Sequence, residues 1–461
     1  MSYSFSYKPL SVPPVKTKYR TIRTKIPSPA TIPVLKKSLK YEPPSANILI
    51  PLVWDKAYDF QVSDISGNRW IDFTSGIFVT NTGHGNKKVI SAIKKVINKP
   101  LLHTFLYPTK LRADLAERLV KISPKGINKA LILSTGAEVT ETALKIARIW
   151  GEKQKVSKNI IVAFEGAFHG ETIGSKTMSG NIKAKEWIGS LYPNIVHLPY
   201  PVSYLESLEV EKSDFGADIF EKDIQNLGKN INLKNIAGFM VETYQGWAAM
   251  FFPKGYIKAL RKFADKNNSL VMFDEVQAGF GRSGKLFGYE YYGVNADVIC
   301  SGKGISGGLP LSAVLSRNEL LAVDVQGLNS THTGSPVPCA SALANIDFII
   351  NKNLVRESYR KGKIINKFFK NLQKQFPDRI RALHGAGLAF AAIITRPGTD
   401  ELDYDLVDYL IEKAFQKGVL MIRTGKGSVK LGPPLTIPDE ALLEGLKVIE
   451  ESFKECIDEI K

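Results

Sequence analysis

The stretch Val271-Met-Phe-Asp-Glu-Val-Gln277, together with Ser301-Gly-Lys-Gly304, decides the fold of this 461-residue chain. Each stretch lies at the end of a short apolar run, and such runs predict strands that are buried on both faces of a sheet. The pattern recurs between helical stretches, at Ala130–Leu133, Ile160–Phe164, Ile236–Val241, Leu270–Asp274, Val298–Ser301 and Leu311–Leu315. Strands that alternate with helices predict an α/β fold whose sheet is mostly parallel and covered by helices.

The chain divides into three predicted parts. Residues 1–80 form an N-terminal arm and a segment that contributes to a small lobe, residues 81–335 form a large domain, and residues 336–461 form a smaller C-terminal domain. The second boundary rests on a change of pattern after Pro336, where a long helical region precedes strands around Leu388–Ile394 and Val419–Ile422. A final amphipathic helix is predicted from about Pro438 to Ile460.

The composition is that of an ordinary globular protein with a basic excess, because 62 Lys and Arg against 45 Asp and Glu give a net charge of +17. Nucleic-acid binding is one interpretation. The lysines are spread along helical stretches without a recognition motif, however, so a solvated basic surface is preferred. No apolar run is long enough for a membrane helix, and the three distant cysteines lack metal-ligand spacing. We therefore expect no nucleic-acid, membrane or metal partner, and a cytoplasmic location.

Asp274 and Lys303 each stand at the end of a buried-strand pattern, where a charged side chain is costly to desolvate and usually has a partner or a task. One task fits both residues. Lys303 would hold pyridoxal 5'-phosphate (PLP) as a Schiff base and, once substrate has released it, act as general base at Cα. Asp274 would keep the ring nitrogen of the cofactor protonated. The alternative for Asp274 is a strand-end carboxylate that caps a loop.

A turn of small residues, Ser134-Thr-Gly-Ala-Glu138, lies between an apolar strand and a helical stretch, where backbone N–H groups and the helix dipole can bind an anion. It lacks the G-x-G-x-x-G pattern of a dinucleotide site. The P-loop-like run Gly279–Leu286 ends in Leu where Ser or Thr should bind magnesium. Phe168 is either a ring that stacks on a planar cofactor or a core residue beside a turn. His169 is either a hydrogen-bonded structural histidine or a catalytic one.

These motifs resemble those of the class III (ω-amino-acid type) PLP-dependent aminotransferases of fold type I. The resemblance extends from about Asp59 to the C-terminus. Its anchors are Asp72–Ile77, Asn81–Gly85, Ser134–Glu138, Phe168–Gly170, Val271–Gly284, Ser301–Gly304, Thr331–Pro336 and Leu431–Leu435. The resemblance implies a large domain with a mostly parallel sheet of seven strands covered by helices, and a smaller α+β domain.

By position, the resemblance implies a set of cofactor-binding residues, which are Gly136, Ala137, Phe168, His169, Glu242, Asp274, Gln277, Lys303 and Thr331. In this implied site Gly136 and Ala137 bind the phosphate, Phe168 stacks on the ring, and Gln277 meets the 3-hydroxyl group. Thr331 would reach the phosphate of the neighbouring subunit's cofactor. The resemblance thereby implies a homodimer with a shared active site.

The substrate side departs from the family pattern. Members that act on ω-amino acids commonly have Arg after the His-Gly pair, where this chain has Glu171, which would favour an amine or hydroxyl over a distal carboxylate. They also carry a Glu–Arg gate that admits glutamate, where this chain has Trp247 and Lys430. Lys430 either holds a substrate α-carboxylate as a point charge or faces the surface. Trp247 either forms an aromatic wall for a bulky or apolar substrate or packs over its loop, and Ile77 completes the predicted substrate residues.

The predicted function is that of a PLP-dependent aminotransferase, which moves an amino group from an amine or amino-acid donor to an oxo acid by ping-pong exchange through Lys303. The departures argue against a standard 4-aminobutyrate, ornithine or acetylornithine enzyme. A racemase or epimerase on the same scaffold is the alternative, because the Glu–Arg gate is absent. A basic binding protein that kept only the fold is disfavoured by the intact Asp274 and Lys303.

Overall fold

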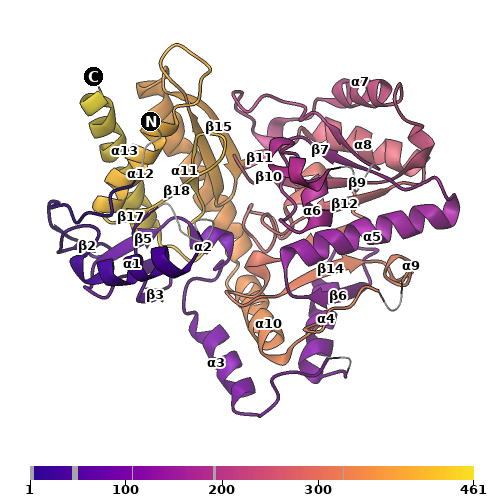
Figure 1. The fold of residues 1–461 in the computed structure, drawn as a ribbon, viewed down its shortest axis with the longest axis horizontal. Helices are drawn as coiled ribbons and strands as arrows, with labels where there is room; N and C mark the ends of the chain where they lie inside the picture. The colour runs from indigo at the N-terminus through magenta and orange to yellow at the C-terminus, as the bar shows by residue number, and fades with distance from the viewer. Residues whose placement is uncertain (1–4, 44–49, 106, 190–193, 325–326, 461) are drawn as a thin grey trace.

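A computed structural model describes residues 5–43, 50–105, 107–189, 194–324 and 327–460 of the chain. The chain forms a large domain and a small lobe, which lie side by side at the right and left of Figure 1. Among the described residues, no helix is both long and apolar enough to cross a membrane.

The large domain is built on a mixed sheet that has seven strands within the described residues. In spatial order these are β6 (Lys129–Leu133), β14 (Ser312–Ser316), β13 (Val298–Ser301), β12 (Leu270–Asp274), β9 (Ile236–Glu242), β7 (Ile160–Phe164) and β8 (Ile195–Leu198). All pairings are parallel except those of β14, which runs antiparallel to both neighbours. The predicted fold class is confirmed. β8 is the strand of this sheet that the sequence did not predict.

Helices cover both faces of this sheet because each strand buries side chains on both sides. Along β12, Val271 and Phe273 share a core cluster with Leu260 of α8 (Lys254–Lys266), whereas Met272 packs in a second cluster with Val139 of α5 (Gly136–Gln154). Successive side chains of a strand point to opposite faces, so the two helices lie on opposite sides of the sheet. Figure 1 shows this arrangement, with α7 (Ala217–Leu227) packed beside α8.

The small lobe joins the C-terminal part of the chain, from α11 (Leu354–Gln375) onward, to its N-terminal segment. Its antiparallel sheet has the order β15 (Ile380–Ala386), β16 (Ala389–Ile394), β19 (Ser428–Leu431) and β18 (Ile422–Arg423). A second sheet contains β1 (Val15–Lys16), β2 (Thr21–Ile22), β5 (Arg69–Asp72), β4 (Gln61–Ser63) and β3 (Lys56–Tyr58), and β17 (Val419–Leu420) pairs with β5. The parallel pairing of β17 with β5 attaches the N-terminal sheet to the lobe.

The remaining helices surround these sheets. The small lobe contains α11 (Leu354–Gln375), α12 (Tyr404–Gln416) and α13 (Asp439–Ile460), and α1 (Ile32–Tyr41) belongs to the N-terminal segment. The large domain carries α4 (Lys110–Ile122) against β6 and α6 (Ile173–Met178) against α5. Helix α10 (Pro336–Asn351) packs on α3 (Lys87–Ile97) and α4. The first helix of the predicted C-terminal domain, which begins at residue 336, therefore lies against these two helices.

A buried arginine connects the two lobes. The Arg282 side chain follows β12 along the chain and is fully buried. Its guanidinium donates to the carbonyl oxygens of Leu388 (2.9 Å) and Pro433 (2.6 Å), to Asn81 Oδ1 (2.7 Å) and to Ser75 Oγ (3.2 Å). These acceptors belong to the small lobe and to the segment that follows β5, so the guanidinium holds three distant parts of the chain together.

Trp70 provides a test of the junction between the N-terminal sheet and the small lobe. It is fully buried on β5, donates from Nε1 to the carbonyl oxygen of Phe415 (2.8 Å) and stacks on the Phe415 ring. We expect Trp70→Ala to lower the free energy of unfolding by about 3–5 kcal/mol, because it empties a core site and removes a hydrogen bond. Urea denaturation followed by circular dichroism measures the change.

Trp187 supplies the matched control, because 65% of its surface is exposed. Trp187→Ala should change the free energy of unfolding by no more than about 0.5 kcal/mol. Equal free energies of unfolding for the two variants would contradict a stabilising role of Trp70 at this junction.

Candidate active site

A cavity of about 70 Å³ lies at the carboxyl ends of β7, β9, β12 and β13. It is lined by Gly136, Ala137, Phe168, His169, Gly170, Glu242, Asp274, Val276, Gln277 and Lys303. This set contains every predicted cofactor-binding residue except Thr331. The site follows the general rule for open α/β sheets, in which ligands bind beyond the carboxyl ends of the strands.

One wall of the cavity is the N-terminus of α5. A capping box begins this helix, because Thr135 Oγ1 accepts from the Glu138 amide (3.2 Å) and the Glu138 carboxylate accepts from the amides of Ser134 (2.8 Å) and Thr135 (2.7 Å). The first residues of the helix, Gly136 and Ala137, line the cavity. A Cβ atom at Gly136 would lie 3.1 Å from Cγ1 of Val276, so the glycine permits a close approach of the Val276 side chain. Helix N-terminal amides in this position suit an anionic group.

Two buried carboxylates form the next wall. Asp274 Oδ2 lies 2.8 Å from His169 Nδ1, and Asp274 Oδ1 accepts from the Val276 amide at 3.0 Å. The carboxylate of Glu242 accepts from the amides of Phe168 (3.0 Å) and Gly246 (2.9 Å). Burial raises the pKa of Glu242 to about 7, and nearby Asp274 adds to that rise. The sequence left the role of His169 open, whereas the structure makes it the hydrogen-bonding partner of Asp274.

Lys303 faces these carboxylates from the end of β13. Desolvation lowers the pKa of its amine, while the charges of Asp274 and Glu242 oppose that shift. Its backbone has φ +44°, a left-handed conformation that costs free energy in a residue with a Cβ atom. An amine with a lowered pKa is a better nucleophile and base near neutral pH than an exposed lysine.

One lining residue, Phe168, forms an aromatic pair with Trp247. Phe168 is 37% exposed, and its ring meets the Trp247 ring edge-on, with centroids 6.3 Å apart. Trp247 also packs over Gly425 of the small lobe, where a Cβ atom would lie 2.6 Å from the indole. Trp247 therefore contacts both the cofactor-side aromatic residue and the small lobe.

Lys430 contacts Gly246, the residue before Trp247, and is only 3% exposed. Its Nζ donates to Gln277 Oε1 at 2.7 Å and to the carbonyl oxygen of Gly246. The alternative that Lys430 faces the surface is wrong, since strand β19 directs this side chain into the junction between the lobes. Lys430 is not among the residues that line the cavity.

Three other predicted residues lie outside the cavity. Glu171 pairs with Lys176 (2.7 Å) and lines a neighbouring hollow beside α5. Ile77 is 46% exposed within α2 (Ser75–Phe78), whose four residues all have positive φ. Thr331 is exposed and lies beyond the cavity lining. Its predicted contact is with a second subunit, so its role stays a prediction.

The sequence did not identify two contributors to the site. Lys176 pairs with Glu171 from five residues away, a spacing outside the i,i+3 and i,i+4 pairs of a helix, so charge patterning carries no signal for it. Val276 lines the cavity and packs over Gly136 and Gly302, but an isolated apolar residue after a strand carries no recognisable signal.

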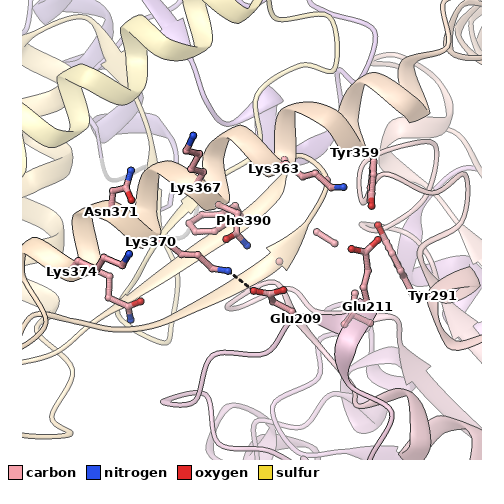
Figure 2. A pocket seen from close by; sticks show the side chains of 17 residues that line it. Glu209, Glu211, Tyr291, Tyr359, Lys363, Lys367, Lys370, Asn371, Lys374 and Phe390 are labelled. Carbon is pink, nitrogen blue, oxygen red and sulfur yellow. Dashed lines mark hydrogen bonds and ion pairs between the residues drawn. The ribbon is translucent and has the colours of Figure 1, made fainter.

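A second hollow of about 620 Å³ lies between α11 and the segment Glu209–Glu211 (Figure 2). Lys363, Lys367, Lys370 and Lys374 line it from α11, and Lys370 pairs with Glu209 across it. These lysine side chains are exposed, and none of the cofactor-binding residues reaches this hollow. Its geometry is that of a solvated groove between the lobes.

Comparison with known proteins places this chain in a family. Residues 41–453 match the family described as aminotransferase class-III. The chain is 32% identical over 441 residues to a 4-aminobutyrate aminotransferase of Mycobacterium leprae, covering 93% of this chain and 97% of the relative. It is 33% identical over 410 residues to the mitochondrial ornithine aminotransferase of Arabidopsis thaliana, covering 87% and 81%.

A solved (S)-enantioselective omega-transaminase from Thermomicrobium roseum matches with a TM-score of 0.83 at 26% identity, covering 92% of this chain and 98% of that chain. Family match, identity and fold agree over nearly the whole length. The chain therefore belongs to the class III aminotransferases, PLP-dependent enzymes of fold type I.

Proposed function

We propose that the cavity between Phe168 and Lys303 is the PLP site of this aminotransferase, and that Lys303 holds the cofactor as a Schiff base. The observation that carries this proposal is the meeting of Asp274 and Lys303, from the ends of adjacent strands β12 and β13, in one cavity with the N-terminus of α5. The donor set fits the cofactor. Amides of α5 suit its phosphate, and a buried carboxylate suits its ring nitrogen.

Each residue of the site has a definite task in the proposed reaction. Bound PLP takes up the electron pair that is left when a substrate loses its Cα proton. Asp274, held by the Val276 amide and paired with His169, stabilises positive charge at the ring nitrogen. Phe168 stacks against the ring. Lys303 Nζ takes the proton from Cα and, in the second half-reaction, returns a proton to the oxo acid skeleton.

For the donor we propose a primary amine or amino acid with an apolar group beside Trp247 and Ile77. The Trp247 ring meets the Phe168 ring, and Ile77 is an exposed apolar side chain. Glu171 offers no cation for a distal carboxylate because it carries the same charge and pairs with Lys176. The named relatives are aminotransferases, which favours amino transfer over racemisation. Oxo product from a donor screen with oxo-acid acceptors tests the reaction. Deuterium uptake at Cα without oxo product would instead indicate a racemase.

Lys303→Ala tests the proposed attachment of the cofactor. We expect borohydride to fix PLP covalently to the parent protein but not to Lys303→Ala, and amino transfer to fall on the order of 10²–10⁴-fold or more, because both the amine and the general base are gone. Lys361→Ala is the matched control, since Lys361 is also buried but donates to the Leu435 carbonyl oxygen away from the cavity. PLP fixed covalently to borohydride-treated Lys303→Ala would place the attachment elsewhere.

Asp274→Asn tests the carboxylate at the ring nitrogen. Asn can still accept from the Val276 amide, so we expect the fold to survive while the transfer rate falls on the order of 10²–10³-fold, as when one electrostatic group is removed from other active sites. Single-turnover kinetics with saturating PLP measures the rate. A variant that retains the parent rate would exclude this role for Asp274.

We further propose a homodimer that shares its active sites, and a cytoplasmic location. The exposed apolar residues Leu101, Leu102 and Phe105 support the dimer, because His103 packs 5.3 Å from His332 and so brings this segment beside Thr331. Three buried, unpaired cysteines within the described residues are typical of a reducing compartment.

Thr331→Val tests the contribution of the second subunit. Loss of a hydroxyl that donates to phosphate should raise the PLP dissociation constant by roughly 10- to 100-fold. Fluorescence titration measures this constant, and light scattering reports the subunit number. A monomeric parent, or unchanged PLP affinity in Thr331→Val, would contradict the shared site.

A further inference from the structure

Lys430 is a buried cation that the proposed reaction does not use. It lies on β19 of the small lobe and is 3% exposed, at a depth where a lysine is rare unless its ammonium group has hydrogen-bond partners. No carboxylate among the described residues lies within ion-pair distance of its Nζ. The charged groups that act on it from the surrounding elements are Glu242, which attracts it, and Lys303 and Arg282, which repel it.

The partners of Lys430 are oxygen atoms of neutral groups. Nζ donates to the carbonyl oxygen of Gly246 and to Gln277 Oε1 (2.7 Å), and it lies 4.5 Å from the centre of the Phe78 ring. Burial lowers the pKa of Lys430 to about 7. A neutral amine keeps two N–H donors, so both hydrogen bonds persist in either protonation state.

These contacts determine which atom of Gln277 the cavity can use. A carboxamide has one acceptor oxygen and one donor NH2 group. Lys430 donates to the oxygen, so the NH2 group of Gln277 is the group left for a ligand in the cavity that Gln277 lines. The 3-oxygen of PLP carries negative charge and accepts hydrogen bonds, which matches an NH2 donor.

We propose that Lys430 is a positioning residue, which fixes the Gln277 carboxamide so that its NH2 group is presented to the 3-oxygen of the cofactor. This inference rests on the proposed PLP site. It decides between the two roles that the sequence left open, because Lys430 neither faces solvent nor lines the cavity as a carboxylate receptor would. Two of its donors are already engaged within the protein.

The role proposed for Lys430 can be tested through the protonation state of bound PLP. Protonation at Lys303 Nζ changes the visible absorbance of bound PLP, and a pH titration gives its midpoint. A donor at the 3-oxygen and a positive charge nearby both disfavour protonation at that nitrogen. Loss of the donor or of the positive charge therefore raises the pH midpoint of this absorbance change.

The experiment is a double-mutant cycle on the PLP-loaded enzyme with Lys430→Met, Gln277→Leu and the double variant. We expect Lys430→Met to raise the absorbance midpoint by roughly 0.5 to 1 pH unit, which corresponds to the loss of one hydrogen bond. In the Gln277→Leu background the same substitution should shift the midpoint by less than half as much, because Lys430 acts through Gln277. The PLP dissociation constant, measured in the same four proteins, should show the same coupling.

Two further variants complete the design. Lys430→Arg keeps the donors and should restore most of the parent midpoint. Lys361→Met removes another buried lysine of the small lobe, one that donates to the Leu435 carbonyl oxygen, and should leave the midpoint unchanged. Equal shifts in the two Gln277 backgrounds, or no shift in Lys430→Met, would overturn the inference while the parent still bound PLP. A parent without a PLP absorbance band would overturn the proposed cofactor site instead.

Discussion

The burial of the Arg282 guanidinium is the constraint on which the arrangement of the two lobes depends. A cation in the interior must keep its hydrogen-bond acceptors, because an unpaired buried charge costs several kcal/mol. Its acceptors come from the segment after β5 and from two parts of the small lobe. Arg282 itself follows the strand that ends in Asp274, so the same contacts that join the lobes fix the edge of the sheet where the cofactor residues meet.

The sequence predicted most of the large-domain sheet because parallel strands that are covered on both faces are continuous apolar runs. β12 shows the principle, since all five of its residues are buried. β8 escaped prediction for a physical reason. It contains His197, whose Nε2 lies 3.1 Å from both the Met178 carbonyl oxygen and Lys185 Nζ, so a polar residue with local partners interrupts a four-residue run.

The meeting of the predicted cofactor residues in one cavity was predictable, whereas the surroundings of the predicted substrate residues were not. Strand ends converge at one edge of a parallel sheet, so Asp274 and Lys303 had to lie close together once the strands were identified. The burial of Lys430 depends on how β19 meets the large domain, and the pairing of Glu171 with Lys176 depends on the local course of the chain before α6. Apolar periodicity carries no information about either contact.

The hydrogen bond between Lys430 and Gln277 crosses from one lobe to the other. Lys430 belongs to β19 of the small lobe, whereas Gln277 belongs to the loop after β12 in the large domain. With the role proposed for Lys430, rotation of the small lobe away from the sheet would break this bond and change the proton affinity at the bound cofactor. By thermodynamic reciprocity, the charge state of the cofactor then changes the free energy of lobe closure by the same amount. Proton binding at the cofactor and lobe position would thus be coupled through the Gln277 carboxamide.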